Sequence, residues 1–162
     1  MTATLNRPKI VFLDVDGTLT NTKTRVLGLK ADPFVVHLVN KCIAAGYNVV
    51  LSSTYANTCT QEEAKALLLE MGISDFVWAP NEYWKCKPLA NRAKKILSWF
   101  EDAQLRTNEV DFFVFDDDAH VAWEAELRDN LINCDEDNGI MLHGSSAFFS
   151  VEYQVATLGS TE

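Results

Sequence analysis

Two carboxylates stand at the end of an apolar run near the start of this chain. The stretch KIVFLDVDGTLT, Lys9–Thr20, places Asp14 and Asp16 directly after Ile10–Leu13. Burying an acid beside such a run is costly unless an opposite charge lies near it. The pair therefore indicates a site that holds a cation, and Gly17 permits a tight turn after it.

Two further groups of polar residues follow apolar runs in the same way. The hydroxyl residues 52–54 follow Asn48–Leu51, and the aspartates 116–118 follow Asp111–Phe115. Ligands of open parallel sheets bind beyond the carboxyl ends of the strands. We therefore expect these side chains to share one site with the first acid pair.

Strands alternate with amphipathic helices along the chain. Short apolar runs predict strands over Lys9–Leu13, Asn48–Leu51, Phe76–Ala79, Asp111–Phe115 and Leu131–Cys134. Helical spacing and capping residues predict helices between Asp32 and Gly46, between Thr60 and Gly72, from Pro88 to Phe100, over Ala119–Asp129 and over Ser145–Leu158. This order predicts an α/β fold with a mainly parallel five-stranded sheet covered on both faces.

Length and composition indicate one globular domain over residues 1–162, with a core at about 9–135 and a last helix at about 145–158. The net charge of −9 disfavours broad nucleic-acid binding. The four cysteines are widely spread without zinc spacing, which favours reduced thiols. The stretch MTATLNRPK lacks the apolar run typical of a signal peptide, and the apolar runs are too short to cross a bilayer. We therefore expect a cytoplasmic protein without a membrane partner.

Clustered carboxylates with a nearby lysine suit Mg²⁺, a hard cation that prefers oxygen ligands. We expect its ligands among Asp14, Asp16, Asp116 and Asp117. A phosphate monoester could then approach Asp14, because the metal and the lysine offset the repulsion. In this interpretation Asp14 attacks phosphorus, and Asp16 protonates the leaving oxygen and later activates water.

The remaining phosphoryl oxygens need hydrogen-bond donors. A hydroxyl of Ser52 or Ser53 and backbone N–H groups can supply them, and Gly17 and Thr18 are included as phosphate-binding candidates. Thr18 can also tether Asp16.

Either Lys85 or Lys87 can supply the ammonium group, since both precede the helix expected to begin at Pro88. Leu89 and Ala93 lie four and eight residues after Lys85, which slightly favours Lys85 on helical register. Both lysines remain candidates.

Two other acidic sites fit less well. A calcium loop that begins at Asp14 would need glycine and glutamate at its sixth and twelfth positions, where this chain has Leu19 and Arg25. In a response-regulator receiver, the acid pair comes first and the phosphorylated aspartate ends a middle strand. The early Asp-Gly-Thr and the late aspartates disfavour that arrangement.

The motifs resemble those of the haloacid dehalogenase (HAD) superfamily. FLDVDGTLT looks like its first motif, VVLSST like its second and FVFDDD like its fourth. The resemblance implies a Rossmann-like three-layer α/β/α sandwich and a Mg²⁺-dependent phosphatase that works through an aspartyl-phosphate. Lys87-Pro88 is similar to the third motif of many members. YWKC and Thr54–Asn57 instead resemble small HAD domains associated with nucleic-acid end repair.

Substrate size follows from what the chain lacks. The intervals 16–52 and 53–85 leave no room for the cap domain that many members of the superfamily insert there. We expect an open site, closed only by a flap over Thr18–Lys30 and suited to a phosphate on a macromolecule, such as a nucleic-acid end. The alternative is a HAD-fold binding or regulatory module with little turnover. The substrate and the oligomeric state stay open.

Overall fold

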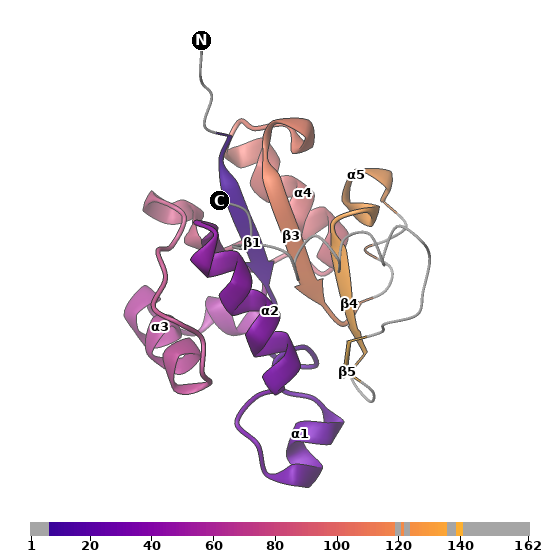
Figure 1. Cartoon of the computed structure of the whole chain (residues 1–162). Coiled ribbons are helices and arrows are strands. Elements are labelled where there is room, and N and C mark those ends of the chain that lie inside the picture. The colour runs from indigo at the N-terminus through magenta and orange to yellow at the C-terminus, as the bar shows by residue number, and fades with distance from the viewer. Residues whose placement is uncertain (1–6, 119–120, 122–123, 136–138, 141–162) are drawn as a thin grey trace.

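The centre of the fold is a sheet in which strands distant in sequence lie side by side (Figure 1). The computed structural model describes residues 7–118, 121, 124–135 and 139–140. The strands are β1 (Lys9–Leu13), β2 (Asn48–Leu51), β3 (Asp111–Asp116), β4 (Leu131–Asp135) and β5 (Gly139–Ile140). Their order is β2-β1-β3-β4-β5. The first four are parallel, and the short β5 runs antiparallel to β4.

Helices connect the strands. They are α1 (Thr22–Leu27), α2 (Pro33–Ala44), α3 (Gln61–Glu70), α4 (Arg92–Asp102) and α5 (Ala125–Arg128). Short 3₁₀ turns are η1 (Thr54–Asn57), η2 (Asn81–Trp84) and η3 (Thr107–Glu109). No helix in the described part of the chain is long and apolar enough to cross a membrane.

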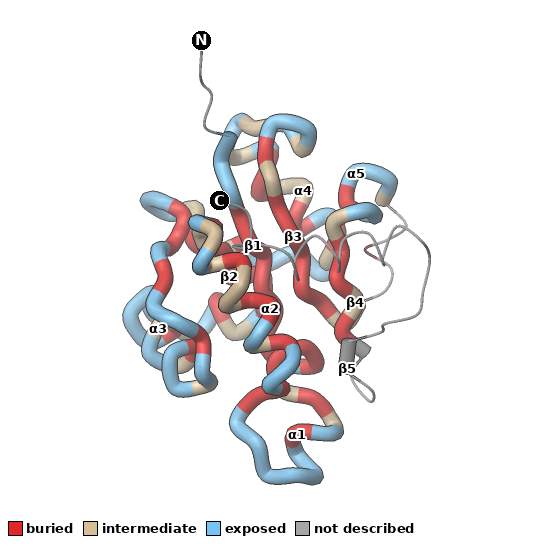
Figure 2. Tube along the Cα trace, in the orientation of Figure 1, coloured by how far each residue is buried: buried red, intermediate tan, exposed pale blue. Residues whose placement is uncertain are grey.

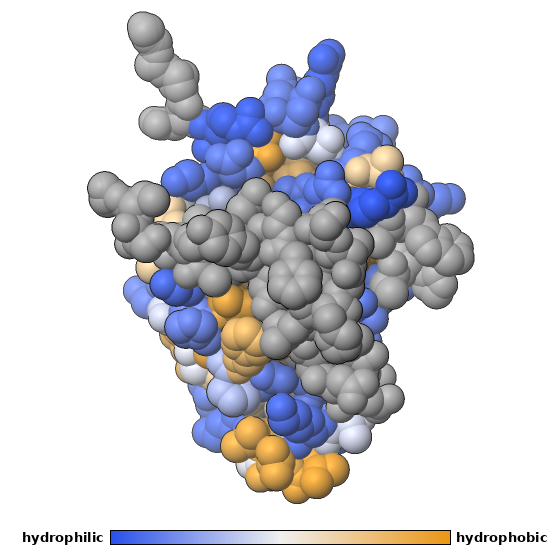
Figure 3. All heavy atoms as spheres, turned by 45° about the vertical axis from the view of Figure 1, so that its right-hand side comes forward, coloured by the Kyte–Doolittle hydropathy of each residue, from blue (hydrophilic) through white to orange (hydrophobic). Residues whose placement is uncertain are grey.

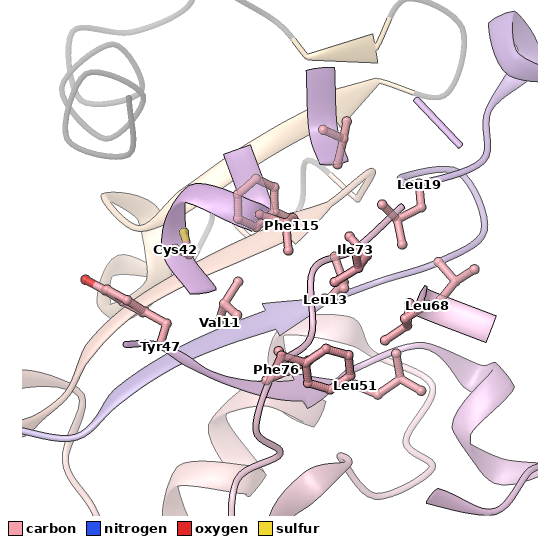
Figure 4. Close-up of a cluster of buried hydrophobic side chains, with 14 of the residues drawn as sticks. Val11, Leu13, Leu19, Cys42, Tyr47, Leu51, Leu68, Ile73, Phe76 and Phe115 are labelled. Carbon is pink, nitrogen blue, oxygen red and sulfur yellow. The ribbon is translucent and has the colours of Figure 1, made fainter. Parts of the chain in front are cut away.

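Helices cover both faces of the sheet, because successive strand residues point to opposite sides. Val11 and Leu13 of β1 belong to the core cluster that includes residues of α2 and α3 (Figure 4). Ile10 and Phe12 belong to the cluster on the other face, with Ile96 and other residues of α4. The strands are accordingly the most buried part of the chain (Figure 2). The predicted parallel sheet between helical layers is confirmed for four strands.

Local signals explain where two of the helices begin. The Asp32 side chain accepts hydrogen bonds from the backbone N–H groups of Phe34 and Val35, and Pro33 occupies the first turn of α2. At α3, Thr60 and Glu63 form the predicted reciprocal capping box. Both caps satisfy backbone donors that a helix start leaves without intrahelical partners.

The expected strand over Phe76–Ala79 forms only one isolated bridge, between Trp78 and Val49. Val49 exchanges backbone hydrogen bonds with Val77 and Ala79, and a second bridge joins Leu51 to Lys85. Pro80 follows directly and has no N–H with which to extend a ladder. The predicted parallel strand at Phe76–Ala79 is therefore wrong: the sheet consists of four parallel strands and the short antiparallel β5.

The predicted start of the third expected helix at Pro88 is wrong. α4 begins at Arg92, where the Asn91 side chain accepts a hydrogen bond from the N–H of Lys94 at 2.9 Å. Leu89 lies before the helix and is 43 % exposed, so helical register no longer favours Lys85. Within the helix expected over Ala119–Asp129, only α5 is described. The helix expected over Ser145–Leu158 lies outside the described residues.

The segment expected to be an irregular flap, Thr18–Lys30, contains α1 and is anchored at its base. Asn21 is buried, caps α1 and donates a side-chain hydrogen bond to Asp32 at 3.0 Å. The chain between Asp16 and Ser52 thus holds only α1 and α2 as helices. Exposed apolar side chains gather around α1 (Figure 3); they include Val26, Leu27 and Leu29.

Candidate active site

The register of the two central strands brings Asp14 and Asp116 together. Leu13 of β1 pairs with Phe115 of β3, and the N–H of Asp14 donates to the carbonyl of Phe115 at 3.1 Å. Asp14 is 2 % exposed and Asp116 is fully buried. One carboxylate oxygen from each of Asp14, Asp116 and Asp117 lies within 4.8 Å of the other two. We call these three residues the aspartate cluster.

Each oxygen of the two buried carboxylates has a donor. Thr18 Oγ1 donates to Asp14 Oδ2 at 3.1 Å, and the N–H of Asp118 donates to Asp116 Oδ1 at 2.9 Å. The other two oxygens, Asp14 Oδ1 and Asp116 Oδ2, lie 3.1 and 2.8 Å from Arg92 Nη1. We call these two the inner oxygens. A single guanidinium nitrogen therefore bridges the two acids.

Burial shifts the proton affinity of both carboxylates. It raises the pKa of Asp14 to about 6; Arg92 opposes the shift and Asp117 adds to it. Burial and then the charge of Asp14 raise the pKa of Asp116 to about 7, against the pull of Arg92. Arg92 is thus the partner that keeps ionisation of this acid pair accessible near neutral pH.

A second cationic side chain lies beside the cluster. Lys95 is 1 % exposed, and its Nζ donates to the carbonyl of Ser52 at 3.1 Å. Burial and the nearby Arg92 lower the pKa of Lys95, while Asp14 and Asp116 act to raise it. The site therefore combines carboxylates with two basic groups from α4.

The two serines after β2 differ in their contacts. The N–H of Ser52 donates to the carbonyl of Leu13 at 2.9 Å, which places Ser52 beside Asp14. Its hydroxyl is buried and has no hydrogen-bond partner within the described residues. Ser53 Oγ accepts from the N–H of Tyr55 at 3.2 Å and caps η1. Only Ser52 therefore has an unused hydroxyl for an incoming ligand.

The turn after β1 is shaped by the aspartate cluster. Gly17 has a φ of 87°, and a Cβ there would collide with the Asp117 carboxylate. Thr18 contacts Asp14 and not Asp16, which it was expected to tether. Asp16 is exposed and is not one of the three clustered acids.

Lys85 and Lys87 lie apart from the cluster. Lys85 Nζ is 3.4 Å from the carbonyl oxygen of Ala56 and lies over the ring of Trp84. Lys87 is exposed and pairs with Asp102 at 2.9 Å. Both line a separate pocket of about 470 Å³ between η2 and α4. In the described structure neither lysine contacts the aspartate cluster.

Sequence reasoning missed Arg92 and Lys95. Both lie in the first turn of α4, on the stripe that continues through Ile96 and Trp99. Ile96 and Trp99 are buried. Basic residues on the apolar stripe of a helix are the signal that could have identified them.

The donor set of the cluster fits a hard divalent cation. Asp14, Asp116 and Asp117 offer carboxylate oxygens, which Mg²⁺ prefers, and Mg²⁺ retains further positions for water or phosphate oxygens.

Replacing Gly17 by alanine should weaken Mg²⁺ binding by about tenfold, as loss of a supporting contact around a metal does. The new Cβ would push the Asp117 carboxylate out of the cluster. Calorimetric titration with Mg²⁺ measures the loss. Gly46→Ala is the matched control, because Gly46 also has a positive φ, 92°, but has no atom within 4 Å of an added Cβ. Equal affinities in the two variants would contradict the expectation.

The stability of the metal-free protein should fall as the pH rises through about 6 to 7. Asp14 and Asp116 have folded-state pKa values above the ordinary 3.8. Between the ordinary pKa of 3.8 and these raised values, the folded state therefore binds more protons than the unfolded state. The contribution of the two acids to the free energy of unfolding is largest at the acidic end of this pH range. Urea unfolding in EDTA at a series of pH values measures this slope. The slope should flatten in Asp116→Asn; an unchanged slope would show that other groups cause it.

Comparison with known proteins supports the motif assignment. Residues 10–143 match the family model described as the HAD domain in Swiss Army Knife RNA repair proteins. No curated protein and no solved structure matches the chain. The matched residues include the whole aspartate cluster, both basic residues of α4 and Ser52. The chain therefore belongs to the family of HAD domains found in Swiss Army Knife RNA repair proteins, within the hydrolases of the HAD superfamily.

Proposed function

We propose that the protein is a Mg²⁺-dependent phosphohydrolase that cleaves phosphate monoesters through an aspartyl-phosphate on Asp14. The observation that carries this proposal is the position of Asp14. Asp14 directly follows β1, and its buried carboxylate lies within 4.8 Å of ligand atoms of Asp116 and Asp117 and contacts Arg92. Such a cluster can hold both a cation and a phosphate beside one nucleophile.

In this proposal the aspartate cluster holds the metal. When bound, Mg²⁺ offsets the negative charge of the phosphate and of the acids. Asp16 was expected among the ligands, but it is exposed and lies outside the cluster. We therefore assign Asp16 to proton transfer at the rim of the site.

The proposed reaction has two displacements at phosphorus. In the first, a carboxylate oxygen of Asp14 bonds to phosphorus, the bond to the ester oxygen breaks, and Asp16 gives that oxygen a proton. In the second, water attacks phosphorus while Asp16 accepts its proton, and the bond to Asp14 breaks to release phosphate. Thr18 holds one oxygen of Asp14 and so orients the carboxylate.

Side chains around the nucleophile would bind the other phosphoryl oxygens. The Ser52 hydroxyl is suited to this because it is buried without a partner in the described residues. We assign the site ammonium to Lys95, because it contacts Ser52 directly beside Asp14. Lys85 and Lys87 remain candidates only if their side chains reorient toward the site. Gly17 contributes to phosphate binding through its backbone in this proposal.

The substrate class that we propose is a macromolecule with a terminal phosphate. The interval between Asp16 and Ser52 holds only α1, α2 and β2, so nothing there has the size of a cap domain. The family description concerns RNA repair proteins, which favours a nucleic-acid end for this chain. The net charge of −9 limits such recognition to a local contact with the end.

Asp14→Asn should abolish the release of phosphate from any ester, because the amide is nearly isosteric but cannot attack phosphorus. The assay covers end-phosphorylated oligonucleotides, phosphopeptides, nucleotides and sugar phosphates with Mg²⁺. Asp75→Asn, which alters an exposed acid paired with Lys65, is the control and should keep full activity. Residual turnover within about tenfold of the wild type would refute the nucleophile assignment. Mg²⁺ binding without turnover of any substrate would favour a binding or regulatory module.

Asp16→Asn should slow esters with poor leaving groups most. An aryl phosphate with a good leaving group needs little protonation, so its first displacement should survive better. The second displacement still lacks its base, so the aspartyl-phosphate should accumulate and give a burst of product. Rapid-mixing kinetics on both ester types measures this. Equal losses without a burst would remove Asp16 from the acid–base role.

A further inference from the structure

The bridging contact of Arg92 occupies the atoms that a metal needs. Thr18 Oγ1 donates a hydrogen bond to Asp14 Oδ2, and the N–H of Asp118 donates one to Asp116 Oδ1. We call these two the outer oxygens. The inner oxygens remain, and Arg92 Nη1 lies 3.1 and 2.8 Å from them. A cation shared by the two buried acids would use these same inner oxygens.

The limited space and the like charges both prevent Arg92 and a metal ion from contacting the inner oxygens at the same time. Mg²⁺ lies about 2.0–2.1 Å from its carboxylate oxygens. An ion between the inner oxygens would therefore fall close to Arg92 Nη1, and two positive charges a few ångströms apart repel strongly in a buried site. Either the Arg92 guanidinium or a metal ion can offset the charge of the two acids, but the space between the inner oxygens accommodates only one of these cations.

Arg92 is the member of this group that can move. Its side chain is 20 % exposed, whereas those of Asp14 and Asp116 are 2 % and 0 % exposed. It starts from the first residue of α4, so turning its side chain toward solvent breaks no hydrogen bond inside the helix. The two acids are fixed by strand ends and by their outer contacts.

We propose that Arg92 and a divalent cation are alternative partners of the inner oxygens. In the metal-free protein Arg92 offsets part of the charge of Asp14 and Asp116, and on metal binding its guanidinium leaves them and turns outward. There it can contact an anionic oxygen of the substrate. This inference rests on the metal-dependent function proposed above. It adds that Arg92 serves as the counter-ion of the two acids when the metal is absent.

The direct test is a pair of crystal structures of the wild-type protein, one in EDTA and one in Mn²⁺, whose anomalous signal locates the ion. We expect Mn²⁺ between Asp14 and Asp116, with Arg92 Nη1 beyond hydrogen-bond distance of both. Mn²⁺ in the cluster with both Arg92 contacts kept would overturn this inference but leave the proposed function intact. No Mn²⁺ in the cluster at saturating concentration would overturn both.

Calorimetry gives an independent readout. Arg92→Gln should bind Mg²⁺ at least about threefold more tightly than the wild type, because the guanidinium that competes for the inner oxygens is absent. The titration is run near pH 8.5, well above the ordinary range of carboxyl pKa values. Without Mg²⁺, the same variant should melt at a lower temperature. Lys94→Gln is the control, since it removes one charge from an exposed position of the same helix. Unchanged or weaker Mg²⁺ binding in Arg92→Gln would contradict the inference.

Discussion

The structure around the candidate site depends on one constraint: two carboxylates are buried side by side at the ends of adjacent strands. The parallel register of β1 and β3 leaves Asp14 next to Asp116, so separating them would disrupt the sheet. Like charges in a buried site raise each other's pKa and destabilise the fold unless partners surround them. Thr18, the N–H of Asp118 and Arg92 supply those partners. The turn after β1, the end of β3 and the start of α4 therefore take positions that this pair requires.

Strand ends were sufficient to predict that Asp14 and Asp116 lie close together, but not that Asp16 lies outside the aspartate cluster. Asp14 and Ser52 directly follow buried strands, and Asp116 is the last residue of one. Paired strands bring these positions together whatever the helices do. The basic residues were harder to predict, because they depend on where α4 begins. Pro88 is a favourable first residue of a helix, but the Asn91 side chain caps the helix that forms. That later start places Arg92 and Lys95 in the first turn of α4.

The strand at Phe76–Ala79 shows a different limit. Its apolar residues have the pattern of a buried strand, and Phe76, Trp78 and Ala79 are indeed buried. Whether such a run forms a strand depends on hydrogen bonds with the edge of β2, which the next residues must continue. Pro80 and the turn η2 end the pairing after one bridge, and it resumes at Lys85. Burial pattern alone therefore predicted the environment of the segment but not its backbone pairing.

Formal charge explains why the proposed reaction needs both α4 cations and a metal. With all three carboxylates of the aspartate cluster ionised, Arg92 and Lys95 leave the metal-free site with one net negative charge. That site would repel a phosphate dianion. A bound divalent ion makes the net charge positive, and the dianion then returns it to one negative charge. If Arg92 also turns toward the phosphate, its positive charge offsets the charge of the substrate and no longer that of Asp14 and Asp116. A bound metal would thus change the net charge of the site from negative, which repels a phosphate, to positive, which attracts one.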